Sequence, residues 1–224
     1  MMNRHNYRTT LLLGALLGAV PQLQLQGQSS VPVTQEPRHH HVFANADLRV
    51  FDVIVPVGDT TLFHLHANDY TYITFGGAEL VAEVMGNAPG PLSLKDGEVR
   101  FSRSPLTHRV SNPSTRPFHN LTIELLGHRP GAEMDPISPG DSVVLENDRV
   151  RAVRREIAAG ATATLDHTHG HAMDVFVTAG AVEEDEDGGT QPVTPGMFRW
   201  RDGGAQRLYN VGDHPLVVIT IYVK

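Results

Sequence analysis

Hydrophobic and polar residues alternate in short runs along most of the chain, and no run after Val20 has the spacing of an amphipathic helix. The runs are rich in β-branched residues and are separated by turn residues such as Gly58-Asp59 and Gly76-Gly77. Many short strands divided by Gly and Pro are typical of β-sandwiches and barrels. The pattern predicts strands in residues 48–57, 70–75, 119–125, 150–157, 175–178 and 216–223.

One pattern occurs twice within this strand-rich region. The matching pairs, in chain order, are 49–58 with 151–160, His64-Leu65-His66 with His167-Thr168-His169, His108 and Asn112 with Gln206 and Asn210, and Thr122-Ile123 with Thr220-Ile221. Four overlays in the same order are hard to attribute to chance. We therefore predict two copies of one β unit, at residues 42–129 and 146–224, joined by a linker at 130–145.

The N-terminus has the pattern of an export signal. Arg4 and Arg8 stand in a head without acidic residues, and residues 11–20 form an apolar run that a polar stretch follows. The run is shorter than the ~20 apolar residues that span a bilayer. We predict a signal peptide at 1–28, a linker at 29–41, and a periplasmic or secreted mature protein without an integral membrane span. A frayed hydrophobic N-terminus or a short anchor is the alternative.

Composition then limits the functions that the chain can have. It carries 18 Lys and Arg against 25 Asp and Glu, a net charge of −7, which argues against a nucleic-acid partner because such partners need a basic face. The absence of cysteine excludes disulfides, thiolate metal sites and cysteine nucleophiles. The composition is unusual in its 13 histidines among 224 residues, so the positions of the histidines are the most informative guide to function.

Two of these histidines stand at strand spacing. His64 and His66 are two residues apart, so both imidazoles project from the same face of a strand, and His108 follows about forty residues later in another short strand. A neutral imidazole is the commonest protein ligand for first-row metals. Such a pair alone is as often merely solvated, but its recurrence in both repeats favours a metal site with open positions for water or substrate.

At these residues the sequence resembles the cupin superfamily, specifically a two-repeat bicupin. Gly58, His64, His66 and Gly77 reproduce the spacing of the first cupin motif, with Tyr70 in place of its glutamate, and His108 with Asn112 matches the second motif. The resemblance implies an all-β fold of two double-stranded β-helix (jelly-roll) barrels packed together. It also implies a divalent transition metal, with Fe, Mn, Zn, Ni and Cu all compatible with the ligands.

The second repeat departs from the family pattern in a different way. His167 and His169 correspond to the histidine pair, Asp174 stands at the position of the glutamate, and Gln206 replaces the later histidine. Two histidines and one carboxylate are typical of non-haem iron, whereas a neutral amide is a poorer ligand. We expect the first site to be occupied. The second either loads a metal or is a degenerate repeat retained for packing.

The resemblance implies three functional hypotheses. In the first, the protein is a metal-dependent, dioxygenase-like enzyme acting on a small molecule, with the metal on His64, His66 and His108 and with Tyr70 orienting substrate or oxygen. The alternative is a non-catalytic module that binds a metal or a small ligand, and the third is a structural bicupin with empty pockets. The sequence leaves open whether the protein forms a homodimer.

Three other features are interpreted as structural. His39-His40-His41 resembles a metal-binding tract by composition, but it is interpreted as the solvated entry to the first strand. The acidic run 183–187 has the residues for calcium binding but lacks a spaced oxygen pattern, so it is interpreted as a solvated hairpin tip. Phe198 and Trp200 alternate with polar neighbours and are interpreted as core residues.

Overall fold

The computed structural model describes residues 29–131, 133–184 and 190–224. The proposed signal peptide therefore lies outside the described residues. Within the described part of the chain, strands β1 to β19 account for nearly all regular structure, with one 3-10 turn, η1 (Val33–Gln35), and no α-helix. No helix in that part is long and apolar enough to cross a membrane.

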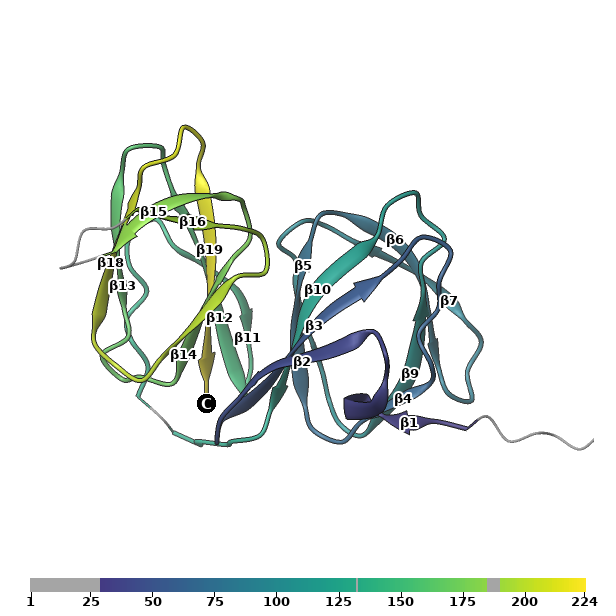
Figure 1. The fold of residues 1–224 in the computed structure, drawn as a ribbon. Helices are drawn as coiled ribbons and strands as arrows, with labels where there is room; N and C mark the ends of the chain where they lie inside the picture. Colours follow the sequence, from purple (N-terminus) through teal and green to yellow (C-terminus); the bar gives the residue numbers. More distant parts are fainter. Residues whose placement is uncertain (1–28, 132, 185–189) are drawn as a thin grey trace, which may run out of the picture.

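The first unit is built from two five-stranded sheets that face each other (Figure 1). One sheet has the order β1-β4-β9-β6-β7, and its strands are β1 (Val31–Pro32), β4 (His64–His66), β9 (Leu106–Ser111), β6 (Ala78–Val84) and β7 (Gly90–Leu94). The other has the order β2-β3-β10-β5-β8, and its strands are β2 (His39–Ala44), β3 (Leu48–Val55), β10 (Phe118–Leu125), β5 (Tyr70–Phe75) and β8 (Val99–Ser102).

The second unit repeats this arrangement. Its five-stranded sheet has the order β11-β12-β19-β14-β17, with β11 (Ser142–Glu146), β12 (Val150–Ile157), β19 (Leu216–Val223), β14 (Ala172–Phe176) and β17 (Phe198–Arg201). Its four-stranded sheet has the order β13-β18-β15-β16, with β13 (Thr162–Asp166), β18 (Ala205–Asn210), β15 (Gly180–Glu184) and β16 (Thr190–Val193).

The two units share one strand order, except that β1 has no counterpart in the second. β3 and β12 occupy the same place in their sheets, as do β10 and β19. The turns after β3 and β12 each contain a glycine with positive φ, Gly58 at +74° and Gly160 at +69°, a conformation that other residues rarely adopt. The prediction of an all-β fold of jelly-roll barrels is confirmed.

Three apolar clusters hold the structure together. One, which includes Phe51 and Leu80, fills the first unit, and a second, which includes Phe176 and Leu208, fills the other. The third lies between the units and contains buried residues from β3, β5 and β10 on one side and from β12, β14 and β19 on the other. Figure 1 shows the corresponding strands of the two barrels next to each other. Phe198 and Trp200 pack against this third cluster, as expected for core residues.

Strand alternation explains how one strand serves two surfaces. In β10, Leu121 and Ile123 point to the cluster between the units, whereas Asn120 and Thr122 line a cavity inside the first unit. A polar stripe therefore runs along the interior of the first barrel, opposite the sheet that carries β4.

Candidate metal centre

The three histidines predicted for the first site come together inside the first barrel. His64 and His66 are both buried in β4 with Leu65 only partly covered between them, so the two imidazoles share the inner face. In the neighbouring strand β9, His108 is directly opposite His64 in the register. The ring centroid of His108 lies 4.5 Å from that of His64 and 5.3 Å from that of His66.

Each of these imidazoles has a buried nitrogen without a hydrogen-bond partner in the protein. The three atoms are His64 Nε2, His66 Nδ1 and His108 Nε2. A buried polar atom without a partner is uncommon, because its desolvation is not compensated. The unpartnered Nε2 atoms of His64 and His108 fit a bound transition metal, whereas His66 Nδ1 lies 3.7 Å from the Glu124 carboxylate.

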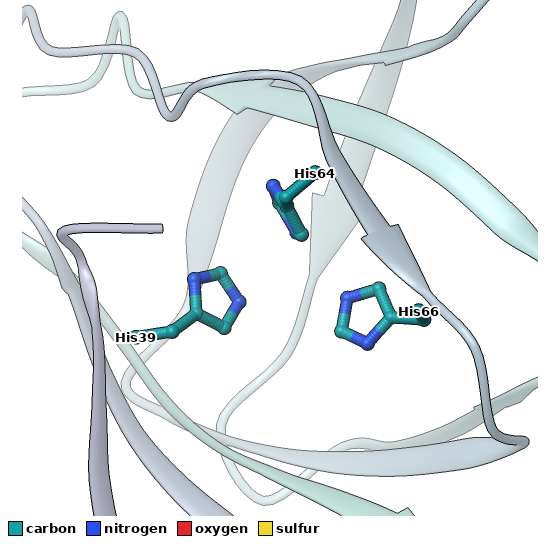
Figure 2. Close-up of side chains that lie close together, drawn as sticks. All are labelled: His39, His64 and His66. Atoms are coloured by element: carbon teal, nitrogen blue, oxygen red, sulfur yellow. The ribbon is translucent and has the colours of Figure 1, made fainter. Parts of the chain in front are cut away.

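His39 adds a fourth imidazole from the opposite sheet, and the interpretation of residues 39–41 as a solvated entry is wrong for this residue. Its side chain is only 6% exposed, whereas His40 and His41 are exposed. The ligand atoms of His39, His64 and His66 all lie within 4.8 Å of one another, and Figure 2 shows their rings around a common space. In the part of the chain that the structure describes, this is the only such group of three or more acidic or histidine side chains.

Glu36 and Leu62 set the orientation of two of these rings. The carboxylate of Glu36 is buried and lies 2.7 Å from His39 Nδ1, and it also accepts a hydrogen bond from the Leu62 amide. The Leu62 carbonyl accepts a hydrogen bond from His64 Nδ1 at 2.9 Å. A carbonyl can only accept, so the proton of His64 resides on Nδ1 and its Nε2 is free to bind a metal.

Tyr70 lies against the histidines and lines the same interior. Its ring stacks on His66 with centroids 4.0 Å apart, and burial raises the pKa of its hydroxyl to about 12. It also lines the interior cavity. The adjacent carboxylate, Asp69, accepts hydrogen bonds from Ser104 and Arg103. Tyr70 therefore meets the cavity as a neutral phenol beside the metal ligands.

The cavity next to the histidines is small. Its volume is about 40 Å³, room for about three water molecules. The wall combines three of the histidines with tyrosines, short polar side chains and apolar residues, namely His39, His64, His108, Tyr70, Tyr72, Thr61, Asn120, Thr122, Val53, Val55, Val110 and Phe118. A water or a small ligand can thus sit beside the imidazoles in mostly enclosed surroundings.

Burial keeps the imidazoles neutral. Burial, and secondarily the neighbouring His39, lowers the pKa of His64 to about 3. Burial likewise lowers the pKa of His66, against an opposing effect of Glu124, and it lowers that of His108, with a further contribution from His64. Metal ions bind neutral imidazole, so at neutral pH these three histidines need to release no proton before they bind.

These pKa shifts predict that the metal-free protein loses stability as the pH falls from about 6.5 toward 3. In that range the unfolded chain, whose histidines have the ordinary pKa of 6.5, binds protons that the folded chain does not bind. Urea unfolding of chelator-treated protein at pH of about 7.5 and about 5.5 measures the effect. A variant with His64, His66 and His108 all changed to glutamine should show a weaker pH dependence. Equal dependence in the two proteins would contradict the assignment.

The four residues predicted for the second site are arranged differently. β13 ends at Asp166, so His167 and His169 follow the strand on a turn, in which Gly170 and His171 have positive φ. His167 is buried, with Nε2 3.0 Å from Asp174 Oδ2.

Most groups around these residues have partners, although His167 Nδ1 and Asp135 Oδ2 are buried without a hydrogen-bond partner. Asp174 accepts a hydrogen bond from Thr220 and lies 3.4 Å from Arg201 Nε. His169 Nε2 lies 3.6 Å from Asp135, and the Gln206 amide donates to the Arg207 carbonyl. The structure thus brings His167 and Asp174 together in a hydrogen-bonded network that includes Thr220. It does not gather them with His169 into a group with closely spaced ligand atoms among the described residues.

Sequence reasoning missed two residues of the first site, His39 and Glu36. The signal that could have found His39 is its composition, three histidines in a row immediately before a β-prone run. Glu36 precedes His39 by three residues, and no motif marks it.

Comparison with known proteins identifies the fold. No protein-family model matches the sequence, and no curated protein matches it. AerE from Microcystis aeruginosa superposes with a TM-score of 0.59 and 11% identity, over 84% of this chain and 98% of that one. A salicylate 1,2-dioxygenase from Pseudaminobacter salicylatoxidans superposes with a TM-score of 0.55 and 13% identity, over 85% of this chain and 77% of that one. A cupin 2 conserved barrel domain protein from Leptotrichia buccalis superposes with a TM-score of 0.52 and 8% identity, over 82% of this chain and 87% of that one.

These similarities show that the chain has a cupin fold. They extend over most of both units, and at such low identity they define the architecture alone. The chemistry has to be inferred from the residues inside the first barrel.

Proposed function

We propose that the protein is a metal-dependent cupin enzyme that acts on a small molecule, with its metal in the first barrel. The observation that carries the proposal is the close group of ligand atoms on His39, His64 and His66, together with the buried, unpartnered Nε2 atoms of His64 and His108. A protein that used this interior only for packing would gain stability from apolar residues there, because unpaired buried nitrogens are costly.

The donor set fits a divalent transition metal. Such an ion, when bound, supplies Lewis-acid or one-electron redox chemistry. His39, His64, His66 and His108 would hold it, and Glu36 would keep His39 in place through the contact at Nδ1.

The remaining wall would position the substrate. Asn120 and Thr122 offer polar groups to a small ligand, and Val53, Val55 and Phe118 limit the entry of water. Tyr70 stays protonated at neutral pH, so its hydroxyl can donate a hydrogen bond to an oxygen atom of the substrate.

The finer features of the proposal are that the protein is a bicupin and that it is exported. The common strand order of the two units supports the first. The basic head and apolar run of residues 1–20 support export to the periplasm or beyond. A dioxygenase-like reaction draws support from an open, histidine-only donor set and from the fold that the chain shares with a salicylate 1,2-dioxygenase.

The test uses protein without a histidine tag, stripped of metal by a chelator and reloaded with Fe(II). We expect one ion per chain by elemental analysis, and oxygen uptake with at least one member of a panel of small acids, diketones and thiols. The control is His167→Ala, which changes the second set only and should leave the ion content unchanged.

A second candidate, a module that binds metal or small ligands without turnover, is favoured by the cavity of about 40 Å³. Stoichiometric metal with thermal stabilisation by panel members, but without conversion of any, would select this candidate. Absence of stoichiometric metal would contradict the metal-dependent enzyme and the metal-binding form of the module.

A further inference from the structure

Glu124 is a buried carboxylate that neither the packing nor the ligand set described above uses. It lies in β10, its side chain is 1% exposed, and both of its oxygens lack a hydrogen-bond partner in the protein. Buried carboxylates are normally paired and hydrogen-bonded, because an isolated charge in the interior is strongly unfavourable. Such a residue in the wall of a histidine cluster calls for a functional explanation.

The surroundings of Glu124 point it at one histidine. Its Oε1 lies 3.7 Å from His66 Nδ1, which is itself buried and unpartnered. On the other side, its Oε2 lies 3.6 Å from Arg49 Nε, in the neighbouring strand β3. In the register, Glu124 stands between Arg49 and Tyr70, and the Tyr70 ring stacks on His66. Glu124 and Tyr70 thus both lie against the His66 ring, with Arg49 on the far side of Glu124.

Its position makes Glu124 a neighbour of the ligands, not one of them. Glu124 Oε1 lies 3.7 Å from His66 Nδ1, at the edge of the His66 ring, and not among the closely spaced ligand atoms of His39, His64 and His66. Its closest histidine atom is His66 Nδ1, and an imidazole that turns Nδ1 toward a carboxylate presents Nε2 to a metal. The same relation exists between Glu36 and His39, where the distance is 2.7 Å.

Charge supports the same role. Four neutral imidazoles provide no negative charge for a dication, so a carboxylate behind one of them stabilises the ion and increases the basicity of that ligand. We propose that Glu124 is a positioning residue, which accepts a hydrogen bond from His66 Nδ1–H and holds its Nε2 toward the metal. This inference rests on the proposed function, because it requires a metal in the first barrel.

The proposal predicts opposite effects of one substitution on metal binding and on stability. Glu124→Ala should weaken Zn(II) binding about 10- to 100-fold. The metal-free variant should melt no lower than the wild type, since removal of a buried carboxylate without hydrogen bonds offsets the loss of its ion pair with the partly exposed Arg49. Glu124→Gln keeps an acceptor oxygen, so its affinity should fall between those of the alanine variant and the wild type.

Three measurements on the full chain test it. Zn(II) affinity is measured by competition with a chromophoric chelator, melting temperature is measured on the metal-free proteins, and the proton on His66 Nδ1 is followed by ¹⁵N NMR of the Zn(II)-loaded proteins. The matched control is Glu83→Ala. Glu83 is another largely buried glutamate of the first unit and is paired with Arg109. Its replacement with alanine should leave Zn(II) affinity unchanged.

The outcomes separate this inference from the proposed function. If the wild type binds Zn(II) and Glu124→Ala binds it equally well, the positioning role is wrong and the metal site stands. Equal losses in Glu124→Ala and Glu124→Gln, with an altered absorption spectrum of the Co(II)-loaded proteins, would overturn it in favour of a direct ligand. A wild type that binds no Zn(II) would refute the proposed function itself.

Discussion

Replacing His64 and His66 together with alanine is expected to remove stoichiometric metal from the protein. The two residues supply two of the buried imidazoles that share the cluster, and neither has a neighbour that could take its place in β4. Loss of a mere orienting partner costs about 10- to 100-fold in metal affinity, so loss of two ligands should exceed that range. Elemental analysis and a competition titration measure the effect.

Two controls make the result specific. His40→Ala changes an exposed histidine next to His39 and should leave the ion content unchanged. The double variant should also remain folded, because the substitution removes buried nitrogens that have no partners. A folded double variant that retains one ion per chain would show that the metal is bound elsewhere.

Replacing Ile219 with alanine is expected to destabilise the whole protein by about 2–5 kcal/mol. Ile219 lies in β19, is fully buried and belongs to the cluster between the two units. The cavity left by its side chain would weaken the packing of both five-stranded sheets at once. The two units should therefore unfold in one transition, at a lower urea concentration than in the wild type.

The measurement is urea unfolding followed by far-ultraviolet circular dichroism and by the fluorescence of Trp200, which packs against the same cluster. The matched control is Ile54→Ala in β3, where the side chain is 41% exposed and the change should stay within about 0.5 kcal/mol. Two separate transitions, only one of them shifted, would contradict joint packing.

The repeat, the β class and the inward histidines of the first unit could all be predicted from the sequence. Alternation fixes which residues of a strand share a face, and it predicts that His64 and His66 lie together, as they do in β4. The matching offsets of the two copies anticipated the common strand order. These features are local or repetitive, which is why sequence patterns contain them.

The contribution of His39 could not be predicted in this way. In a run of three histidines, alternation alone does not say which ring is buried, since that depends on what faces the strand across the barrel. Here the register of β2 against β3 shifts between His41 and Phe43, and Glu36 binds the first ring of the run. Both are long-range or irregular features. Glu124 likewise gains its meaning only from the sheet pairing that places it behind His66.

The second histidine pair shows the reverse situation. His167 and His169 keep the spacing of the first pair, but β13 ends at Asp166, one residue before His167. A turn with positive φ at Gly170 then interrupts the alternation of side chains. A spacing of two places side chains on one face only while the backbone remains extended. The spacing of two residues therefore predicts a shared face correctly for His64 and His66 within β4, but not for His167 and His169 after the end of β13.

Anomalous diffraction from crystals of the metal-loaded protein, recorded at the absorption edge of the bound ion, tests the central claim most directly. We expect one strong peak per chain inside the first barrel, between the imidazoles of β2, β4 and β9. An interior free of anomalous signal at His39, His64, His66 and His108, with the ion at another position on the chain, would contradict it.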